Sequence, residues 1–232
     1  MKTYPILFST PMVRAILQGR KTQTRRLLKP QPEYRKNFDG KGGVFGTWFN
    51  GSNLEHPKFF LKDVEPYYPY GQPGDLIWVR ESHRVFYSST TKTFTVQYSD
   101  GIFKDFYYKS LSLNLIKKLK KRKSLKKGSW VSARFLPNEL ARIWLRNKGY
   151  KIERLNDISE EDAIAEGVEQ RGTCFRHYHL PDAATEHARH SFQTLWNSIH
   201  GPGSWQANPY VWALSFEVVS TSGPYMWVNK SK

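Results

Sequence analysis

Cysteine is almost absent from this chain, in which Cys174 is the only one among 232 residues. A single thiol cannot close an internal disulfide, so a disulfide-stapled scaffold is excluded. Long apolar runs are also missing: no stretch reaches the roughly 18 residues of a membrane span, and MKTYPILFSTPMV lacks the apolar core of a secretory signal. We therefore expect a soluble protein of a reducing compartment, the cytoplasm, with no membrane partner.

Acidic residues are scarce. The chain has 20 Asp and Glu against 36 Lys and Arg, a formal charge of +16, and aromatic residues make up 15% of it. An acidic disordered chain is thereby excluded. Basic side chains neutralise phosphates and aromatic rings stack on bases, so this composition is typical of a nucleic-acid-binding surface. The length suits one large domain or two small ones, and neither an internal repeat nor a separating linker is visible.

The apolar pattern predicts short strands mixed with two or three helices. Ser9-Thr10-Pro11 is a helix start and Gly19 its end, while Asp157 or Ser159 caps a later helix. The expected strands are 4–8, 76–86, 93–98, 140–145, 150–155 and 210–219, with a hairpin near 44–49, and the expected helices are 10–18, 160–166 and 182–199. Such a mixture favours an α+β fold, a small mixed barrel with helices packed outside.

Four segments resemble the ASCH family, the PUA-like β-barrel group, in its phage and prophage branch. They are PILFSTPMVRAILQGRKTQTRR from Pro5, YGQPGDLIWVRE from Tyr70, IERLNDISEEDAIAEGV from Ile152, and FQTLWNSIHG with SWQANPYVWALSFEVV from Phe192. The resemblance implies an α+β, PUA-like (ASCH) barrel of five or six strands with flanking helices. It implies a single domain over 1–222, with insertions at about 29–70, 104–128 and 168–182 and a polar tail at 223–232.

Small bacterial members of this family are amidohydrolases that remove the acetyl group from N4-acetylcytidine. Their G-R-K-T-x-T-x-R loop resembles residues 19–26, and their later helical glutamate corresponds by spacing to the last one in EEDAIAEG. Carried over residue by residue, the resemblance implies Lys21, Thr24 and Glu166 as catalytic residues and requires no cofactor or metal. This chain is about twice as long as those enzymes, so its insertions either enlarge the substrate or cover the pocket.

The residue types of this loop fit acyl transfer. A threonine hydroxyl becomes a nucleophile only when a base takes its proton, and Lys21 can be that base only if burial or nearby positive charge lowers its pKa. Such charge, which also binds a phosphate or an oxyanion, comes from Arg20, Arg25 and Arg26. Glu166 would protonate the leaving N4 amine. Water activated by Lys21 is an equal alternative to Thr24 as nucleophile, and a solvated, non-catalytic phosphate-binding loop is the other interpretation.

Further candidates for binding lie outside this loop. Glu81 ends the IWVRE strand, where it either lines the mouth of a barrel or pairs with Arg80 or Arg84 at the surface. A Gly/Pro-rich loop contributes residues that either read a base edge or pack: Trp205, Asn208 and Tyr210.

The run Lys117–Lys127 contains eight basic residues and no acidic one. We interpret it as a flexible arm that contacts phosphates, with a solubilising surface helix as the alternative. The candidate phosphate-binding residues are Lys117, Lys118, Lys120, Lys121, Arg122 and Lys123.

Cys174 and nearby histidines suggest a zinc site. However, C-x-x-H-x-H followed by H-x-x-H is not the spacing of a standard zinc finger, and structural zinc sites usually have more than one thiolate ligand. We therefore expect no metal. The expected partner is RNA or a nucleoside, or a modified DNA. Three functions follow as hypotheses: an amidohydrolase acting on N4-acylated cytosine, a non-catalytic module that binds RNA or modified DNA, and a phage morphogenesis factor.

Overall fold

The computed structural model describes residues 1–29, 31, 33–36, 42–45, 68–121, 128–180 and 182–223, with backbone alone for 33–36 and 42–45. The chain divides into two compact units. The first unit comprises Met1–Gly19, Gly74–Asn147 and Glu217–Lys232, and the second comprises Arg20–Pro73 and Lys148–Phe216. Each unit combines segments that are far apart in the sequence, which is why no linker is visible in it.

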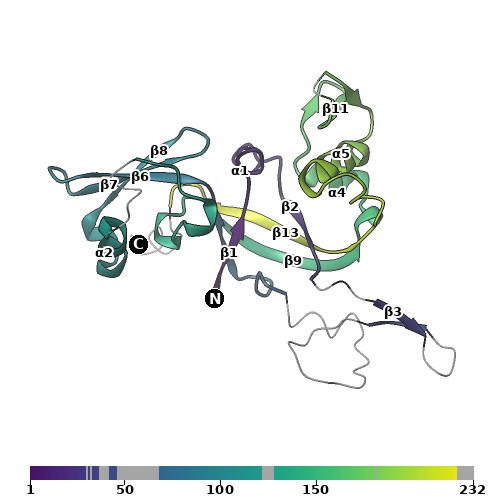
Figure 1. Cartoon of the computed structure of the whole chain (residues 1–232), viewed down its shortest axis with the longest axis horizontal. Helices are drawn as coiled ribbons and strands as arrows, with labels where there is room; N and C mark the ends of the chain where they lie inside the picture. Colours follow the sequence, from purple (N-terminus) through teal and green to yellow (C-terminus); the bar gives the residue numbers. More distant parts are fainter. Residues whose placement is uncertain are drawn as a thin grey trace. The chain divides into compact units, whose positions relative to one another are not determined.

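The described residues include thirteen strands and several short helices, which Figure 1 shows along the chain. The strands are β1 Thr3–Leu7, β2 Gln23–Leu27, β3 Glu33–Lys36, β4 Gly42–Phe45, β5 Leu76–Arg80, β6 His83–Ser88, β7 Thr93–Tyr98, β8 Phe103–Tyr107, β9 Trp144–Arg154, β10 Gln170–Arg171, β11 Cys174–Arg176, β12 Ala184–Thr185 and β13 Tyr210–Ser220. The α-helices are α1 Thr10–Leu17, α2 Leu113–Lys121, α4 Glu160–Ala165 and α5 Ala188–His200, and the 3-10 helices are Tyr108–Ser110, Ala133–Phe135, Asn138–Leu140 and Leu155–Asp157.

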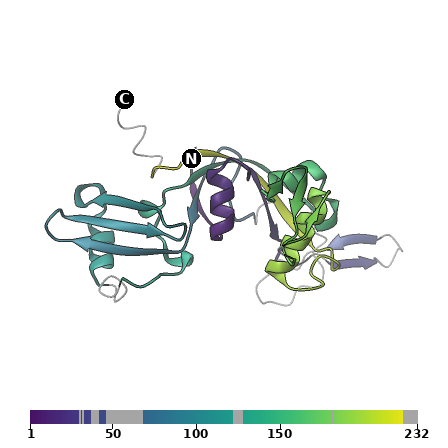
Figure 2. The same cartoon turned by 90° about the horizontal axis from the view of Figure 1, so that it is seen from above.

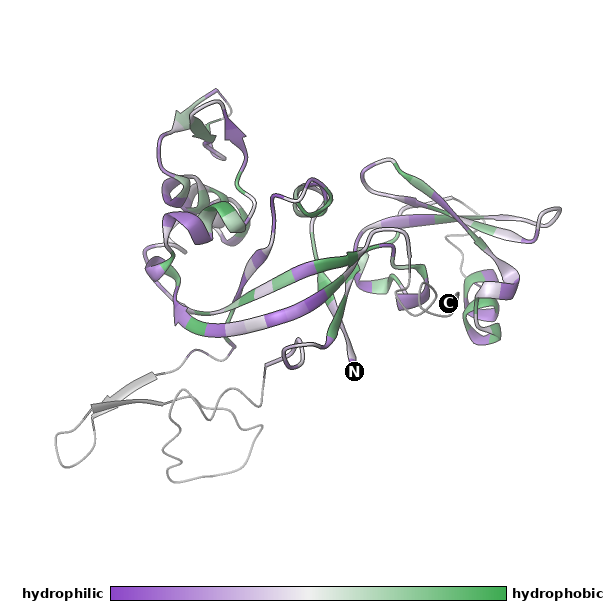
Figure 3. Cartoon of the chain, turned by 180° about the vertical axis from the view of Figure 1, so that it is seen from behind, coloured by the Kyte–Doolittle hydropathy of each residue, from purple (hydrophilic) through white to green (hydrophobic). Residues whose placement is uncertain are grey.

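The main sheet has the strand order β1-β5-β9-β13-β2. β1 pairs with β5 in parallel, whereas β9 pairs with β5 and β13 with β2 in antiparallel fashion. In Figure 3 hydrophobic and hydrophilic residues are interleaved along the two long strands, β9 and β13. The fold is therefore α+β, as expected, but none of the sheets formed by the described residues closes into a barrel.

The first unit contains a three-stranded antiparallel sheet, β6-β7-β8, whose strands run side by side in Figure 2. One face of this sheet packs against α2, which contributes Leu115, Ile116 and Leu119 to the core. The sequence-based prediction of a flexible arm is thus wrong for Lys117–Lys121, since the apolar residues before and between the lysines follow a helical period and anchor a helix. Residues 122–127 lie outside the described part of the chain.

The second unit packs α4 and α5 together around a core that includes Phe192, Trp196 and Trp205. Ser159 begins α4, because its hydroxyl accepts a hydrogen bond from the Asp162 main-chain N–H at 3.1 Å. Gly167 follows α4 with a φ of 85°, a conformation that glycine adopts at little cost. Of the two predicted caps, Asp157 and Ser159, the structure uses Ser159, and α4 ends at Ala165, one residue before the predicted end.

Several expected boundaries are wrong. The strand expected over 76–86 is two strands, β5 and β6, interrupted at Glu81 and Ser82. The strands expected separately over 140–145 and 150–155 are joined: β9 runs as one strand of 11 residues, with Gly149 at a φ of 142°. The helix expected over 182–199 begins at Ala188 and ends at His200, with Ile199 exposed. Of the hairpin expected near 44–49, only residues 44 and 45 are described; they belong to β4, which pairs with β3, and residues 46–49 lie outside the described part of the chain.

No helix in the described ranges combines the length and the apolar character needed to cross a membrane.

Candidate functional site

The predicted catalytic loop and the predicted catalytic helix meet in the second unit. The Thr22 main-chain N–H donates to the Ala165 carbonyl at 2.8 Å, and the Arg20 guanidinium donates to the Gly167 carbonyl at 2.7 Å. These two bonds hold the loop that precedes β2 against the C-terminal end of α4. Glu166, the residue that ends α4, thereby comes next to Lys21.

Lys21 and Glu166 form a buried pair, with side-chain exposures of 1% and 4%. Lys21 Nζ donates to Glu166 Oε2 at 2.6 Å and to the Glu166 main-chain carbonyl at 2.8 Å. Burial lowers the pKa of Lys21 from its ordinary 10.5, while the Glu166 carboxylate opposes this and the charges of Arg26 and Arg25 add to it. A lysine in this environment gives up its proton more readily than one in water, which is what a general base requires.

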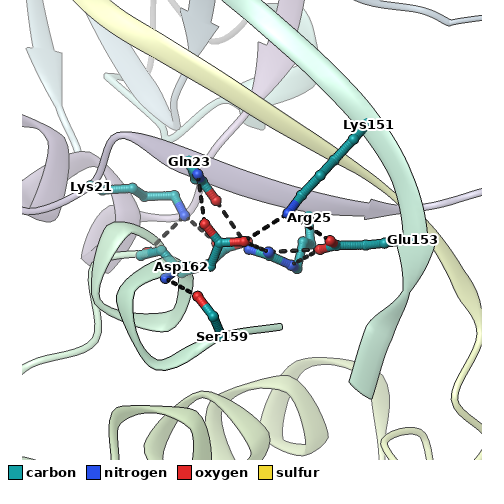
Figure 4. Close-up of polar contacts among 8 residues, drawn as sticks. Lys21, Gln23, Arg25, Lys151, Glu153, Ser159 and Asp162 are labelled. Carbon is teal, nitrogen blue, oxygen red and sulfur yellow. Dashed lines mark hydrogen bonds and ion pairs between the residues drawn. The ribbon is translucent and has the colours of Figure 1, made fainter. Parts of the chain in front are cut away.

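Arg25 lies fully buried among three carboxylates, of which Figure 4 labels those of Glu153 and Asp162. Its Nε donates to Glu153 Oε1 at 2.8 Å and its Nη2 to Asp162 Oδ2 at 2.7 Å, while Nη1 lies 3.4 Å from Glu166 Oε1. The N–H groups of the guanidinium are thus bound to carboxylates on several sides. The structure therefore uses Arg25 to hold the acidic side chains in place, not as an open phosphate-binding group.

Lys151 and Gln23 complete the cluster around Asp162. Lys151 Nζ lies 3.0 Å from Asp162 Oδ2 and 2.9 Å from Glu153 Oε2, and the Gln23 amide donates to Asp162 Oδ1 at 2.9 Å. Burial raises the pKa of Asp162, but the hydrogen bonds from Lys151 and Gln23, together with the charges of Arg25 and Lys151, hold that pKa below its ordinary value. With Lys21, Arg25 and Lys151 opposite Glu153, Asp162 and Glu166, the formal charges balance.

Thr24 lies on β2 between two members of this cluster, Gln23 and Arg25. Side chains alternate along a strand, so the Thr24 side chain points to the opposite face of β2 from these neighbours. Thr24 is buried, and its backbone pairs with Leu214 of β13. The structure thus brings together two of the three predicted catalytic residues, Lys21 and Glu166.

Arg20 and Arg26 differ in their surroundings. Arg20 is half-buried and bound to α4 through the Gly167 carbonyl. Arg26 is also half-buried, pairs with Trp212 along β2, and lies near enough to Lys21 for its charge to lower the lysine pKa.

Glu81 belongs to a second buried cluster of ion pairs, which lies in the first unit. The Arg142 guanidinium donates to both Glu81 oxygens, at 2.9 and 2.7 Å, and to Asp100 at 2.7 Å. Burial raises the pKa of Glu81, although the hydrogen bonds from Arg142 oppose the shift. The alternative of a surface pair with Arg80 or Arg84 is wrong, because Glu81 has no exposed surface and its partner is Arg142.

The loop residues proposed to read a base take part in internal packing. Trp205 is 7% exposed and packs edge-on against Phe192. The Asn208 side-chain oxygen accepts the Asn156 main-chain N–H at 2.9 Å. The Arg154 guanidinium lies 3.9 Å from the centre of the Tyr210 ring. Each of these side chains therefore has a structural partner within the second unit.

The lysines of α2 are exposed at positions Lys117, Lys118, Lys120 and Lys121. Lys120 lies over two aromatic rings, 5.2 Å from Tyr87 and 5.0 Å from Tyr108. Arg122 and Lys123 lie outside the described residues. Within the described ranges no group of three or more His, Cys, Asp and Glu side chains is arranged to hold a metal ion.

Sequence reasoning missed Asp162, Glu153 and Lys151, which tie Arg25 into the cluster. A signal for Asp162 exists, because it precedes Glu166 by four residues and so lies on the same side of α4. Lys151 and Glu153 are two residues apart in β9, so their side chains lie on the same face of that strand. Their partner Arg25 is far away in the sequence, so no local sequence pattern links the three residues.

Comparison of the chain with family models, with curated proteins and with solved structures gave no match in any of the three.

Proposed function

We propose that this chain is a C–N hydrolase directed at nucleosides or nucleic acids, which removes an acyl group from N4 of cytosine. One observation carries the proposal. Lys21 and Glu166, the pair that the ASCH resemblance selects as catalytic from opposite parts of the sequence, are in direct contact at 2.6 Å. Burial lowers the pKa of this lysine, as base catalysis requires.

The reaction that this pair supports is hydrolysis by an activated water. Neutral Lys21 takes a proton from water, and the oxygen forms a bond to the acyl carbon. The proton then passes along the short Lys21–Glu166 hydrogen bond, and Glu166 delivers it to N4 as the bond from N4 to the acyl carbon breaks. The products are cytidine and a carboxylic acid. Because the Thr24 side chain is directed away from this pair, water rather than Thr24 is the nucleophile in this proposal.

Arg25 is a positioning residue in this scheme. Glu166 Oε1 lies 3.4 Å from Arg25 Nη1, while Glu166 Oε2 accepts from Lys21. With both oxygens engaged, the carboxylate is held in one orientation, which is the arrangement that proton delivery to a fixed atom needs.

We also propose that the fold is a member of the PUA-like group. In its support, the four segments of the resemblance coincide with elements of the fold: the first covers part of β1, all of α1 and most of β2, the second covers β5, the third α4, and the fourth most of α5 and β13.

A non-catalytic nucleic-acid-binding module is the second candidate function, and the distribution of charge favours it. The first unit has 20 Lys and Arg against 6 Asp and Glu, a formal charge of +14, whereas the second has 16 against 14, or +2. A strongly basic unit next to a nearly neutral one in the same chain indicates a dedicated surface for a polyanion.

The experiment is incubation of the purified protein with N4-acetylcytidine while cytidine release is followed. We expect release by the wild-type protein and by Lys29→Met, which removes an exposed lysine of the same segment, but none by Lys21→Met. Thr24→Val retains activity if water is the nucleophile. No release by a folded wild-type protein, together with binding of RNA, would instead support the second candidate.

A further inference from the structure

The side chains of β6, β7 and β8 alternate between a face packed against α2 and a second face. The strand register defines the rows of this second face: Arg84 pairs with Gln97 and Gln97 with Phe103, whereas Phe86 pairs with Thr95 and Thr95 with Asp105. This outer face contains no aliphatic residue. Its members are Arg84, Phe86, Ser88, Thr93, Thr95, Gln97, Phe103, Asp105 and Tyr107.

Three aromatic rings on this outer face are exposed. Phe103 and Tyr107 are each 57% exposed and Phe86 is 36% exposed. The residues between them are polar, and the one acid, Asp105, accepts a hydrogen bond from the Thr95 hydroxyl at 2.6 Å. Separated rings in a polar sheet face differ from the continuous aliphatic surface that a buried core or an obligate protein interface needs.

Trp130 extends this aromatic surface beside β6. Two main-chain hydrogen bonds between His83 and Val131, at 3.1 and 2.7 Å, hold the Trp130 segment against the strand. Trp130 is 51% exposed. The Arg84 guanidinium lies between two rings, 5.1 Å from the centre of Trp130 and 5.4 Å from that of Phe86.

A hollow of about 430 Å³ lies at Trp130, lined by Ser82, Ser99, Trp130, Val131 and Ser132. It therefore combines one aromatic ring with three hydroxyl-bearing side chains. An aromatic face stacks on a flat ring, and hydroxyls donate to and accept from the polar edge of that ring. A nucleobase with its sugar has both features.

We propose that the first unit binds single-stranded nucleic acid on the outer face of β6-β7-β8, with unpaired bases stacked on Phe86, Phe103, Tyr107 and Trp130. The outer face itself carries one cation, Arg84, and one acid, Asp105, while the charge of +14 on the unit as a whole favours a polyanion over an uncharged or basic partner. Base faces are available for stacking only in unpaired strands, so duplexes bind more weakly. Tyr107 follows Phe103 by four positions along β8, about 13 Å, a span that several stacked nucleotides cover.

This inference does not depend on the proposed hydrolase. The surface lies within the first unit, and Lys21 and Glu166 lie within the second.

The test measures binding of a labelled oligouridine and of duplex RNA of the same length by fluorescence anisotropy. We expect the single strand to bind more tightly, and Trp130→Ala and Phe103→Ala each to weaken it by about 10-fold without changing the salt dependence. Arg84→Gln is expected to reduce the salt slope by about 0.7, the share of one neutralised phosphate. Leu113→Ala, which removes an exposed apolar side chain from α2, is the matched control and leaves affinity unchanged.

Three results would overturn the inference. The first is equal or tighter binding of the duplex. The second is single-strand affinity that the aromatic variants leave unchanged while circular dichroism shows them folded. The third is a change in oligomeric state, in place of RNA affinity, on truncating the rings, which would assign the face to a second copy of the chain. Loss of cytidine release alone would reject the hydrolase and leave this surface intact.

Discussion

The Lys21 ammonium group donates two hydrogen bonds to a single residue, Glu166: one to its carboxylate at 2.6 Å and one to its main-chain carbonyl at 2.8 Å. The second bond ties the lysine to the backbone that ends α4, so the contact persists when the carboxylate is altered. Glu166→Gln is therefore expected to retain the fold better than Lys21→Met, which removes the shared donor from both acceptors.

Lys21 makes stability depend on pH. Its pKa is lower in the folded protein than the ordinary 10.5, so between the two values the unfolded chain binds more protons than the folded one. Over that window the free energy of unfolding contributed by Lys21 increases as the pH rises. Urea denaturation of the wild-type protein and of Lys21→Met across the alkaline range measures this contribution. The free energy of unfolding of the wild-type protein minus that of Lys21→Met should increase with pH. A difference that stays constant or decreases would contradict a lowered Lys21 pKa.

Arg25 should be among the most destabilising positions of the second unit. Arg25→Met leaves three buried or half-buried carboxylates without their shared partner, which costs about 3–5 kcal/mol. Arg25→Lys should recover only part of this, because one ammonium cannot reproduce the fork of the guanidinium. Chemical denaturation gives both values. A loss below about 1 kcal/mol for Arg25→Met, within the range of an exposed pair, would show that the cluster is solvated.

The Arg142–Glu81 pair gives a parallel prediction in the first unit. Arg142 makes a two-point contact with Glu81, whose side chain is fully buried, so Arg142→Met should cost about 3–5 kcal/mol. Glu81→Gln keeps the shape and one acceptor oxygen and should cost less. If Glu81→Gln proves the more damaging of the two in thermal unfolding, the ion pair is not what holds this region.

Ser159 is the N-cap of α4, the helix whose C-cap residue is Glu166. Ser159→Ala removes the acceptor of the Asp162 N–H and should destabilise the protein by about 1 kcal/mol, whereas Ser159→Asp should preserve the cap. The measurement is thermal unfolding of the two variants side by side. Equal melting temperatures would mean that the cap does not contribute.

The α2 lysines give a prediction for nucleic-acid binding. Because α2 packs against the face of β6-β7-β8 opposite the proposed stacking surface, replacing Lys117, Lys118 and Lys121 by Gln should leave the salt dependence of single-strand affinity nearly unchanged. The helix should remain, since its core side chains are Leu115, Ile116 and Leu119. A slope lowered by about 0.7 per substituted lysine in a salt titration would instead add this face of α2 to the binding surface.

Local chemistry made parts of the fold predictable. The hydroxyl and glycine at the two ends of α4 are strong signals, and the alternation of apolar residues located β7 and β13. Lys21 and Glu166 were predicted as partners through the ASCH resemblance, since no local pattern links them. Arg25 was expected to face a ligand because a sequence shows a basic residue but not the distant carboxylates that surround it.

The missed elements have physical reasons as well. Gly149 next to Asn147 and Lys148 is typical of a turn, yet glycine also passes through a strand at a φ unsuited to other residues, and here it does so within β9. In α2 the dense lysines obscured a narrow apolar stripe, and tertiary packing decided in favour of the helix. The exposed rings of Phe86, Phe103 and Tyr107 became a surface only once the register of three strands was known.

The most direct test of the central proposal is the pH dependence of kcat/KM for N4-acetylcytidine hydrolysis by the wild-type protein. If neutral Lys21 is the base, kcat/KM rises with pH and levels off at a pKa below 10.5, and Lys21→Met shows no turnover at any pH. A wild-type protein that is folded and inactive throughout, or a Lys21→Met variant with the wild-type profile, would contradict the proposal.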